Sequence, residues 1–361
     1  MSTATTTRTF GAELARRVDE HLDGRALRAA RGRVHRKALV MVAWFIVSYL
    51  GVLLASTWAW GILASVSLAL AIAGVGFNIQ HDANHNALFA TRGSKRLTMA
   101  NRLAGLSIHA IGGDSKRWID GHVRVHHAAP NVVGRDHDIE LAPFARMAPS
   151  QRRRSWHGFQ HLYIWVVYGF TTAAIIIGDV VGIIEDSVSG DRHGNRPTLR
   201  DYLAMIGSKG LFVVAMVAIP IWIHSFWPVL LGVLAVLAIS GLVMGVVFQL
   251  AHVAAEADFC TVDERTDARW HEWQVRASVD FCPGDGLEAR LVTWFCGGLN
   301  FQTEHHLFPS LPHPAYREIA PIVAATCAEF GIPYRVQPSL GAALRSHYRH
   351  LRLLGRPPTR G

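Results

Sequence analysis

Four long apolar runs constrain this chain more than any other feature of its sequence. The runs lie at 38–55, 58–79, 202–225 and 227–250. Each is about 18 to 24 residues long, which is the length that an α-helix needs to cross the hydrocarbon core of a bilayer. Only Ser56 and Thr57 separate the first two runs, and 224–228 connect the last two. We therefore predict four transmembrane helices in two hairpins, with Pro220 interrupting the third run.

A fifth apolar region, 162–184, is harder to assign to the membrane. Asp179 lies inside it and Asp186 follows closely. Because a carboxylate at the centre of a bilayer is costly, we expect an interfacial or partly inserted helix here.

Basic residues gather before and after the first predicted hairpin. They are Arg16, Arg17, Arg25, Arg28, Arg31, Arg33, Arg36, Lys37, Arg92, Lys95, Arg96, Arg102, Lys116 and Arg117. Since positive charge collects on the cytoplasmic side of membrane proteins, we expect both segments and both chain termini to be cytoplasmic. The formal net charge of +9 then reflects topology and attraction to anionic lipid headgroups, and no aromatic-interleaved basic groove indicates nucleic-acid binding.

The remaining sequence suggests a simple domain organisation. We expect a basic cytoplasmic segment at 1–37, which is too polar for a cleaved signal peptide, a membrane domain at 38–345 and a basic tail at 346–361. Four cysteines lack CxxC spacing, which favours reduced thiols over a zinc site or a disulfide framework. They are Cys260, Cys282, Cys296 and Cys327.

Three histidine clusters follow the predicted hairpins. His81 and His85 lie four residues apart at the end of the second run, so both imidazoles share one helix face. His122 and His126 repeat that spacing in the following loop, and two more histidines come after the second hairpin. The complete set is His81, His85, His122, His126, His127, His305 and His306. Taken singly, each cluster is also explained by interfacial or surface histidines.

The predicted topology brings the three clusters to one side of the membrane. Each hairpin returns the chain to its starting side, which is why 162–184 is expected not to span. Seven histidines exceed the needs of one tetrahedral zinc and suit two metals. Imidazole ligands leave iron, copper and zinc open. His252, at the exit of the last run, is an eighth candidate, although a helix-end histidine without a metal role is the alternative. The predicted fold is an all-α membrane protein with a cytoplasmic helical cap that holds these histidines.

The segments HDANH, HVRVHH and QTEHH resemble the three histidine boxes of the membrane fatty acid desaturase family. WIDGHVRVHHAAPN, DHDIE, FQLAHVAAE and GGLNFQTEHHLFPSLPHPAYREIAPIVAATCAEFGIPY extend the similarity to bacterial linoleoyl-CoA-type desaturases over 38–334. The resemblance implies a di-iron enzyme that uses O2 to introduce a cis double bond into a long-chain acyl-CoA or acyl-lipid. It implies as iron ligands His81, His85, His122, His126, His127, His252, His305 and His306, with Gln302 at the edge of the set.

Gln302 at the start of the third box resembles the front-end branch, which inserts a double bond between an existing one and the carboxyl end. Members of that branch often carry a fused cytochrome b5 domain with an HPGG motif, which this sequence does not contain. We therefore expect a separate electron donor, either a ferredoxin or a cytochrome b5-like protein with its reductase.

Removing hydrogen from an unactivated methylene requires a strong oxidant. No side-chain acid or base supplies such an oxidant, whereas two irons can generate one from O2.

Metal-binding imidazoles need a carboxylate or carbonyl on the second ring nitrogen. Candidates near the boxes are Asp82, Asp136, Asp138, Glu140, Glu256 and Glu304, each of which is equally well explained as a solvated carboxylate. Trp118 and Asn131 are expected to support the second box, and His137 to lie at the surface or behind a ligand. The histidines treated as non-ligands include His109, His157, His161, His271 and His313.

The substrate tail is expected in an apolar tunnel within the helical bundle, with its headgroup near basic residues at the cytoplasmic face. Two other functions remain open. A histidine-rich di-iron hydroxylase would share metal and topology but insert oxygen. A metal transporter would place polar ligands at mid-membrane depth, whereas the histidine clusters here lie at the ends of the apolar runs.

Overall fold

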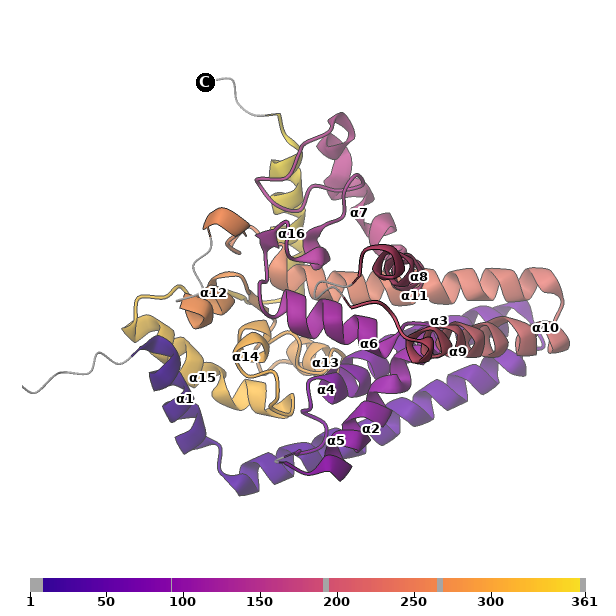
Figure 1. The fold of residues 1–361 in the computed structure, drawn as a ribbon, viewed down its shortest axis with the longest axis horizontal. Helices are drawn as coiled ribbons and strands as arrows, with labels where there is room; N and C mark the ends of the chain where they lie inside the picture. Colours follow the sequence, from indigo (N-terminus) through magenta and orange to yellow (C-terminus); the bar gives the residue numbers. More distant parts are fainter. Residues whose placement is uncertain (1–8, 92, 191–194, 265–268, 358–361) are drawn as a thin grey trace, which may run out of the picture. The chain divides into compact units, whose positions relative to one another are not determined.

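The computed structural model describes residues 9–91, 93–190, 195–264 and 269–357, which are mostly helical (Figure 1). Arg92 and the end of the expected tail, 358–361, lie outside the described residues, as do residues 1–8. The α-helices are α1 (Phe10–His21), α2 (Gly24–Leu53), α3 (Trp58–Val75), α4 (His81–Asn84), α5 (Lys95–Gly105), α6 (Ser115–Trp118), α7 (Gln160–Gly169), α8 (Thr171–Ser189), α9 (Leu199–Val213), α10 (Ile219–Ile223), α11 (Phe226–His252), α12 (Trp270–Arg276), α13 (Leu287–Phe295), α14 (Gln302–Leu307), α15 (Pro314–Glu329) and α16 (Leu340–Gly355). The π-helical segments are η1 (Gly76–Gln80), η3 (Ile119–His126) and η6 (Val214–Ala218), and the 3-10 turns are η2 (Leu106–Ile111), η4 (His137–Ile139), η5 (Ser155–Phe159) and η7 (Val262–Glu264).

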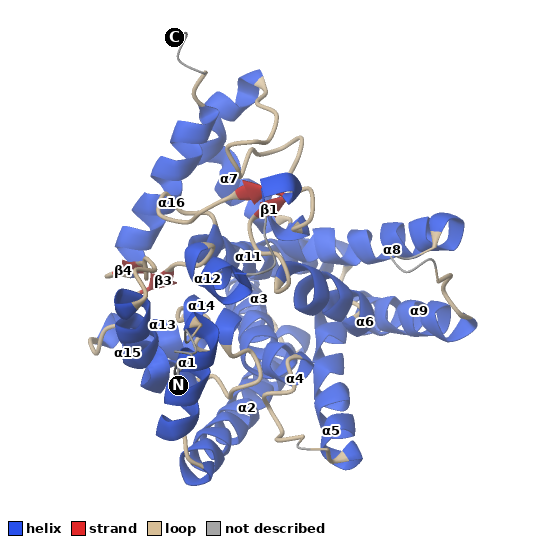
Figure 2. Ribbon diagram, turned by 60° about the vertical axis from the view of Figure 1, so that its left-hand side comes forward, coloured by secondary structure: helices blue, strands red, loops and turns tan. Residues whose placement is uncertain are grey.

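Four two-residue strands, which the sequence did not predict, accompany the mostly helical structure (Figure 2). β1 (Val132–Val133) pairs in parallel with β2 (Cys260–Thr261), and β3 (Asp280–Phe281) pairs in parallel with β4 (Val336–Gln337). The most deeply buried of them, β3, shows why such pairs form, because buried backbone groups need hydrogen-bond partners. Two-residue strands leave no alternating pattern, so the sequence carried no signal for them.

Within the part of the chain that the structure describes, four helical stretches are long and apolar enough to cross a membrane: Gly24–Leu53, Trp58–Asn84, Leu199–Ile223 and Phe226–His252. This agrees with the expected number of spans. The first helix begins at Gly24 rather than near residue 38, because helix-forming residues such as Ala and Arg continue it into the basic segment. The third is not interrupted at Pro220. The π-helical turn η6 lies just before that proline, so the regular hydrogen-bond pattern of the helix is already altered where the N–H of Pro220 is missing.

The fifth apolar region forms two helices that meet at a bend. Ser155–Gly169 and Thr171–Ser189 are bent by 68°, and as a pair they also satisfy the length and composition of one span, which makes five the upper count among the described residues. Asp179 in α8 is buried, and it accepts hydrogen bonds from Lys209 Nζ at 2.6 Å and from the Asp114 backbone N–H at 2.8 Å. An interfacial placement of this region stays a prediction.

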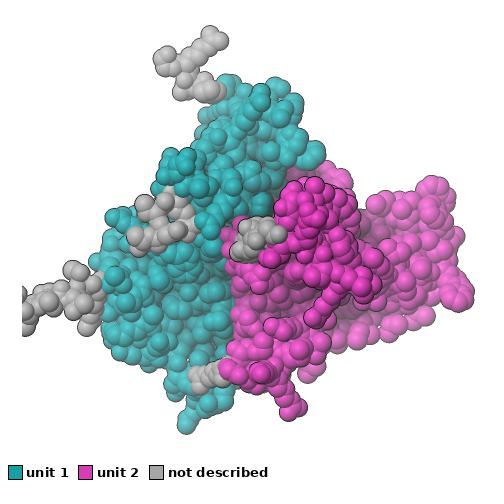
Figure 3. All heavy atoms as spheres, viewed as in Figure 1, with its two compact units in different colours: residues 1–34, 126–161, 249–361 teal, residues 35–125, 162–248 magenta. Residues whose placement is uncertain are grey.

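The chain divides into two compact units, each assembled from separate segments (Figure 3). Unit 1 comprises Met1–Val34, His126–His161 and Gln249–Gly361. Unit 2 comprises His35–Val125 and Leu162–Phe248. The expected boundaries at residues 37 and 345 are not tested by this division.

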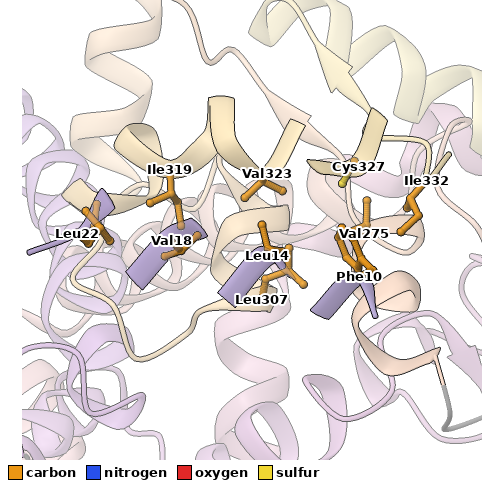
Figure 4. Close-up of a cluster of buried hydrophobic side chains, with 11 residues drawn as sticks. Phe10, Leu14, Val18, Leu22, Val275, Leu307, Ile319, Val323, Cys327 and Ile332 are labelled. Carbon is orange, nitrogen blue, oxygen red and sulfur yellow. The ribbon is translucent and has the colours of Figure 1, made fainter. Parts of the chain in front are cut away.

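Unit 1 has a hydrophobic core in which α1 packs on α15 (Figure 4). The buried α1 side chains Phe10, Leu14 and Val18 recur every four residues and so line one helix face. They meet an equivalent stripe on α15, which includes Ile319 and Val323. Ion pairs border this core, from Arg17 to Glu329 and from Arg33 to Glu318. The N-terminal segment is therefore a structural part of unit 1.

The C-terminal residues 346–355, expected in a basic tail, belong to helix α16. This helix buries Ser346, His347, His350, Leu351 and Leu354 and exposes arginines on its other side. The Ser339 side chain caps its start by accepting a hydrogen bond from the Ala342 N–H at 3.1 Å.

Unit 2 is built around α3. Two-thirds of the most apolar window of its span, 67%, is buried, compared with 11% for the span that contains α2. The two helices are linked by hydrogen bonds to the Ser67 hydroxyl, which accepts from Trp44 Nε1 at 3.0 Å and lies 2.7 Å from Ser48 Oγ. Because α3 ends in η1 and α4, its packing also sets the position of the first histidine box.

Candidate metal centre

The first histidine box lies in unit 2, where the chain passes from a π-helical turn into α4. His85 N–H donates to the His81 carbonyl at 3.1 Å, so one α-helical turn separates the two residues and their rings lie 4.6 Å apart. Helix α5 approaches this turn closely at Gly105. A Cβ atom there would lie 2.1 Å from Asn84 Oδ1, so the Asn84 side chain packs directly on the backbone of α5. The predicted shared face of His81 and His85 is therefore present.

His122 joins the first box to form the unit 2 cluster, defined as His81, His85 and His122. Its ring centroid lies 5.5 Å from each of the other two, and all three side chains are buried. Trp118 stacks on His122 at 4.5 Å and presents its edge to His81 and His85 at 5.8 and 6.0 Å. Trp118 ends α6 and His122 lies in η3, so the expected role of Trp118 in supporting the second box agrees with its contacts.

The remaining candidate histidines gather in unit 1. We call this the unit 1 cluster, and it consists of His126, His127, His252, His305 and His306, all buried. The ring of His306 lies 5.0 Å from His126, 4.7 Å from His252 and 4.3 Å from His127. The ligand-type nitrogens of His126, His252 and His306 all lie within 4.8 Å of one another. Side chains from η3, α11 and α14 thus converge at one point.

The spacing of nitrogens in the unit 1 cluster fits a bound metal ion. His306 Nε2 lies 3.1 Å from His252 Nε2, and His305 Nε2 lies 3.0 Å from His127 Nε2. Imidazole binds metals at about 2.0–2.1 Å, so two such ligands at a right angle around one ion sit about 2.9 Å apart. The donor set is nitrogen throughout, which suits iron, copper or zinc and does not suit magnesium or calcium.

Asp136 fixes the orientation of His126. Both of its carboxylate oxygens lie 3.1 Å from His126 Nδ1, and Asp138 Oδ2 lies at 3.3 Å. Burial alone would lower the pKa of His126, but the two carboxylates raise this pKa to about 9. With Nδ1–H donated to Asp136, Nε2 is the nitrogen that remains for a metal. Two of the six carboxylates considered from the sequence therefore lie against a candidate ligand.

Three further groups orient the other rings of the unit 1 cluster. His306 Nδ1 donates to Gln274 Oε1 at 2.8 Å, His252 Nδ1 donates to the Ala277 carbonyl at 3.0 Å, and His305 Nδ1 lies 3.1 Å from the Tyr316 hydroxyl. Gln274 also donates to the His127 carbonyl at 3.1 Å. Sequence reasoning missed Gln274, Tyr316 and Ala277, because a lone glutamine, tyrosine or carbonyl outside the boxes carries no motif.

Asn131 ties these partners together from a position just after the second box. Its side-chain amide donates to the carbonyls of His252 at 2.9 Å, Asp258 at 3.1 Å and Ala277 at 3.2 Å. Its backbone N–H donates to Asp136 Oδ2 at 2.8 Å. The residue has a φ of 57°, a conformation that asparagine tolerates better than most side chains. The expected supporting role of Asn131 therefore agrees with its contacts.

Gln302 lies beside the ligand nitrogens. Its Nε2 is 2.9 Å from His252 Nε2, and the side chain is buried. An amide can present either its nitrogen or its oxygen at such a point. Its distance therefore allows the edge position that the sequence suggested.

A buried pair of carboxyl groups lies behind the third box. The Tyr334 hydroxyl donates to Asp280 Oδ2 at 2.5 Å and to Glu304 Oε1 at 2.9 Å, and the Thr303 N–H donates to Asp280 Oδ1 at 2.9 Å. Burial raises the pKa of both carboxyl groups, and the neighbouring Asp280 carboxylate raises the pKa of Glu304 further. Glu304 was considered from the sequence as a partner for an imidazole. In the structure its carboxyl group contacts Tyr334.

Several other residues considered from the sequence lie elsewhere. Asp82 Oδ1 is 3.9 Å from His81 Nδ1, beyond hydrogen-bonding distance. Glu140 accepts from the Gly134 N–H, and Glu256 accepts from the Ser346 hydroxyl. His137 is exposed, as one of its two expected placements required. Of the histidines treated as non-ligands, His157 bonds to the Pro143 carbonyl at 3.0 Å.

Comparison with known proteins identifies the family of this chain. The family model described as fatty acid desaturase matches residues 56–338. The sn-1 linoleoyl-lipid 6-desaturase of Arthrospira platensis is 34% identical over 353 residues, covering 97% of this chain and 93% of that protein. The protein of the same name from Synechocystis sp. is 31% identical over 331 residues, covering 90% of this chain and 89% of its own length. The acyl-lipid (8-3)-desaturase of Physcomitrium patens is 32% identical over 333 residues, covering 88% and 66% respectively. The chain therefore belongs to the fatty acid desaturase family and is an acyl desaturase, an oxidoreductase.

Proposed function

We propose that this chain introduces a cis double bond into a long acyl chain carried on a lipid, on the carboxyl side of an existing double bond. The observation that carries the proposal is the presence of two buried, all-imidazole clusters in a chain with four candidate membrane spans. The relatives named 6-desaturase and (8-3)-desaturase support a lipid-borne substrate and this regiochemistry.

The eight candidate histidines would hold two irons of one catalytic centre. Those of the unit 2 cluster and those of the unit 1 cluster are joined through the four-residue step from His122 to His126. Gln302 would sit at the edge of the ligand set, directly or through water. Bound iron would supply the oxidising power, drawn from O2, that hydrogen removal from an unactivated methylene requires.

The protein residues around the histidines have three tasks. Asp136, Gln274 and the Ala277 carbonyl keep Nδ1 of their histidines protonated, so that Nε2 carries the lone pair. Trp118 fills the space beside the unit 2 cluster and keeps water from it. Asn131 and Tyr334 hold the loops that carry these groups.

Apolar cavities in unit 2 support a path for the acyl tail. A cavity of about 560 Å³ lies along α3 and α11 and is lined by Trp58, Leu68, Pro228 and Ile239, among others. Further along the same two helices, a cavity of about 30 Å³ touches His81. The lining of both cavities is mainly aliphatic and aromatic, which suits a hydrocarbon chain.

We further propose the membrane arrangement expected from the sequence. Spans α2 with α3, and α9–α10 with α11, would form two hairpins, so that both termini and the histidines lie on the cytoplasmic side. Electrons would come from a separate ferredoxin or cytochrome b5-like protein with its reductase.

Expression in a bacterial host of known lipid composition tests the proposal. Mass spectrometry of the lipids should reveal an acyl chain that has lost two hydrogens, with the new double bond nearer the carboxyl end than the existing one. A product that has gained oxygen would instead identify a hydroxylase. Metal uptake into vesicles without any change in lipids would identify a transporter.

A further inference from the structure

Arginines and exposed aromatic residues gather in unit 1, away from both histidine clusters in sequence. Arg152, Arg154, Trp156 and Phe159 lie in or just before η5, and all four are exposed. Arg352 and Arg356 lie at the end of α16 and are also exposed. We call these six residues the arginine–aromatic face.

The two segments of this face are held in direct contact. Arg153 Nε donates to the Gly355 carbonyl at 2.7 Å, and Gln160 Nε2 donates to the Leu351 carbonyl at 2.9 Å. A Cβ atom at Gly355 would lie 2.2 Å from the His157 carbonyl oxygen, so the backbones touch there. The end of α16 accordingly lies beside the start of α7 in both ribbon views (Figures 1 and 2).

The charge of these segments is one-sided. No aspartate or glutamate occurs between Glu140 and Asp179, or after Glu329. Within these stretches, residues 141–161 and 340–357 carry eight arginines, which are Arg146, Arg152, Arg153, Arg154, Arg345, Arg349, Arg352 and Arg356. Arg146 and Arg153 donate to carbonyls of α16, whereas the four arginines of the face point to the exterior. Such a concentration of positive charge attracts a polyanionic surface.

The aromatic residues identify that surface as a membrane. Phe159 is 67% exposed, and the exposed apolar side chains of Leu162 and Val166 follow it along α7 at successive helical turns. Trp156 donates its indole N–H to the Pro143 carbonyl at 3.0 Å, and the guanidinium of Arg154 lies 5.3 Å from its ring centroid. Arginine and tryptophan at the end of an apolar helix are typical of the boundary between hydrocarbon and headgroups, where each can keep its polar end in water.

We propose that the arginine–aromatic face binds the headgroups of anionic phospholipids at the surface of the membrane in which the chain resides. The phosphates would pair with Arg152, Arg154, Arg352 and Arg356, while Phe159 and Trp156 enter the headgroup layer. An acidic electron-donor protein is the other partner that positive charge would attract, but the exposed apolar stripe that continues along α7 favours lipid.

Lipid binding by the purified full-length chain in neutral detergent tests the proposal. Native mass spectrometry would compare phosphatidylglycerol and phosphatidylcholine with identical acyl chains. Because each arginine near an anionic surface contributes roughly fivefold in binding, Arg152→Ala/Arg352→Ala should weaken phosphatidylglycerol binding roughly twenty-fold and leave phosphatidylcholine binding unchanged. Lipid that binds as substrate adds equally to the lipid binding of wild type and variant, so it does not affect the difference between them.

A matched control removes two exposed arginines elsewhere in unit 1. Arg269→Ala/Arg290→Ala lowers the net charge by the same amount and should keep wild-type phosphatidylglycerol binding. Equal losses in both double variants, or no loss in either, would overturn the proposal. So would unchanged lipid binding combined with a higher KM for the electron donor in Arg152→Ala/Arg352→Ala, which would assign the face to a protein partner.

A second measurement locates the face in a bilayer. A fluorescent label on Ser155→Cys, in vesicles that are about a third phosphatidylglycerol, should be quenched by lipid-attached quenchers and protected from aqueous ones. A label that stays accessible to aqueous quenchers in those vesicles contradicts the proposal.

Discussion

The unit 1 and unit 2 clusters use the same side chain but are held in place by different means. In the unit 1 cluster, Asp136, Gln274 and the Ala277 carbonyl each accept a hydrogen bond from an imidazole Nδ1. In the unit 2 cluster, the prominent contacts are between rings, with Trp118 stacked on His122. The histidines of unit 2 come from one helix end and one π-helical segment, whereas those of unit 1 come from three separated stretches of chain.

This difference predicts how each cluster responds to change. Hydrogen bonds specify both the tautomer and the direction of a ring, so losing one changes the metal affinity of that ligand directly. Ring packing specifies position alone, and neighbouring side chains can partly replace it. Substitutions behind the unit 1 cluster should therefore have larger effects than substitutions beside the unit 2 cluster.

Loss of one ligand from either cluster should have the largest effect. His85→Ala in unit 2 and His305→Ala in unit 1 should each abolish product formation while the amount of protein in the membrane stays constant. Lipid analysis and immunoblotting of the membrane fraction measure the two quantities. The exposed His137 is the control, and His137→Ala should keep full activity. If only one of the two clusters is required, the two do not form one centre.

Removal of an outer partner from the unit 1 cluster should come next. Gln274→Leu takes the acceptor from His306 Nδ1 and should lower iron content or activity about 10- to 100-fold. Gln160→Leu is a matched control, because Gln160 is equally buried in unit 1 but bonds only to backbone groups of Arg146 and Leu351. That variant should lose stability and keep its iron affinity. Equal iron loss in both would mean that Gln274 acts on folding alone.

Metal uptake should depend on pH through His126. Because its pKa is raised to about 9, the metal-free ring holds a proton below that pH, and this proton must leave when a metal binds. Affinity should therefore fall by about tenfold for each pH unit below 9 on account of this ring. In Asp136→Asn, which removes the main charge that raises the pKa, the fall should begin at a lower pH. Titration of the metal-free wild type and of metal-free Asp136→Asn with Co²⁺ at several pH values measures this dependence. Identical pH profiles in the two proteins would contradict the role given to His126.

Changes beside the unit 2 cluster should have the smallest effect. Aromatic stacking contributes about 0.5–1.5 kcal/mol beyond area burial, so Trp118→Leu should weaken metal binding by no more than about tenfold. Trp118→Phe should recover part of the loss. Trp44→Leu removes a tryptophan of the same unit that bonds to Ser67 and should leave metal content unchanged. An effect of Trp118→Leu as large as that of Gln274→Leu would remove the distinction between the two clusters.

The histidine boxes were readable from the sequence because their spacing is short and the residue type is rare within apolar chains. The four span candidates were readable because apolar length is a local property. Both follow from neighbours in the chain, so no knowledge of tertiary contacts was needed.

The residues that orient the histidines could not be predicted from the sequence, because their contacts join positions that are distant in the chain. Gln274 and Tyr316 reach His306 and His305 across 32 and 11 residues of chain, and nothing in their local sequence marks them. One π-helical segment lies just before His81 and another contains His122. A hydrophobic pattern with a period of 3.6 residues does not predict such segments.

The sequence of the N-terminal segment contains a repeat of apolar residues that indicates its structural role. Phe10, Leu14, Val18 and Leu22 recur every four residues, which is the pattern of a buried helix face. The many arginines around them favoured the interpretation as a basic segment. Some of those arginines instead border the core by pairing with carboxylates, as Arg17 does with Glu329.

The proposed function requires that the unit 1 and unit 2 clusters together bind two irons in one centre. Iron analysis combined with Mössbauer spectroscopy of the purified full-length chain can establish this. We expect two irons per chain with nitrogen ligation and magnetic coupling between them, and loss of that coupling in both His85→Ala and His305→Ala. A single iron per chain, or two irons that are magnetically independent, would contradict it.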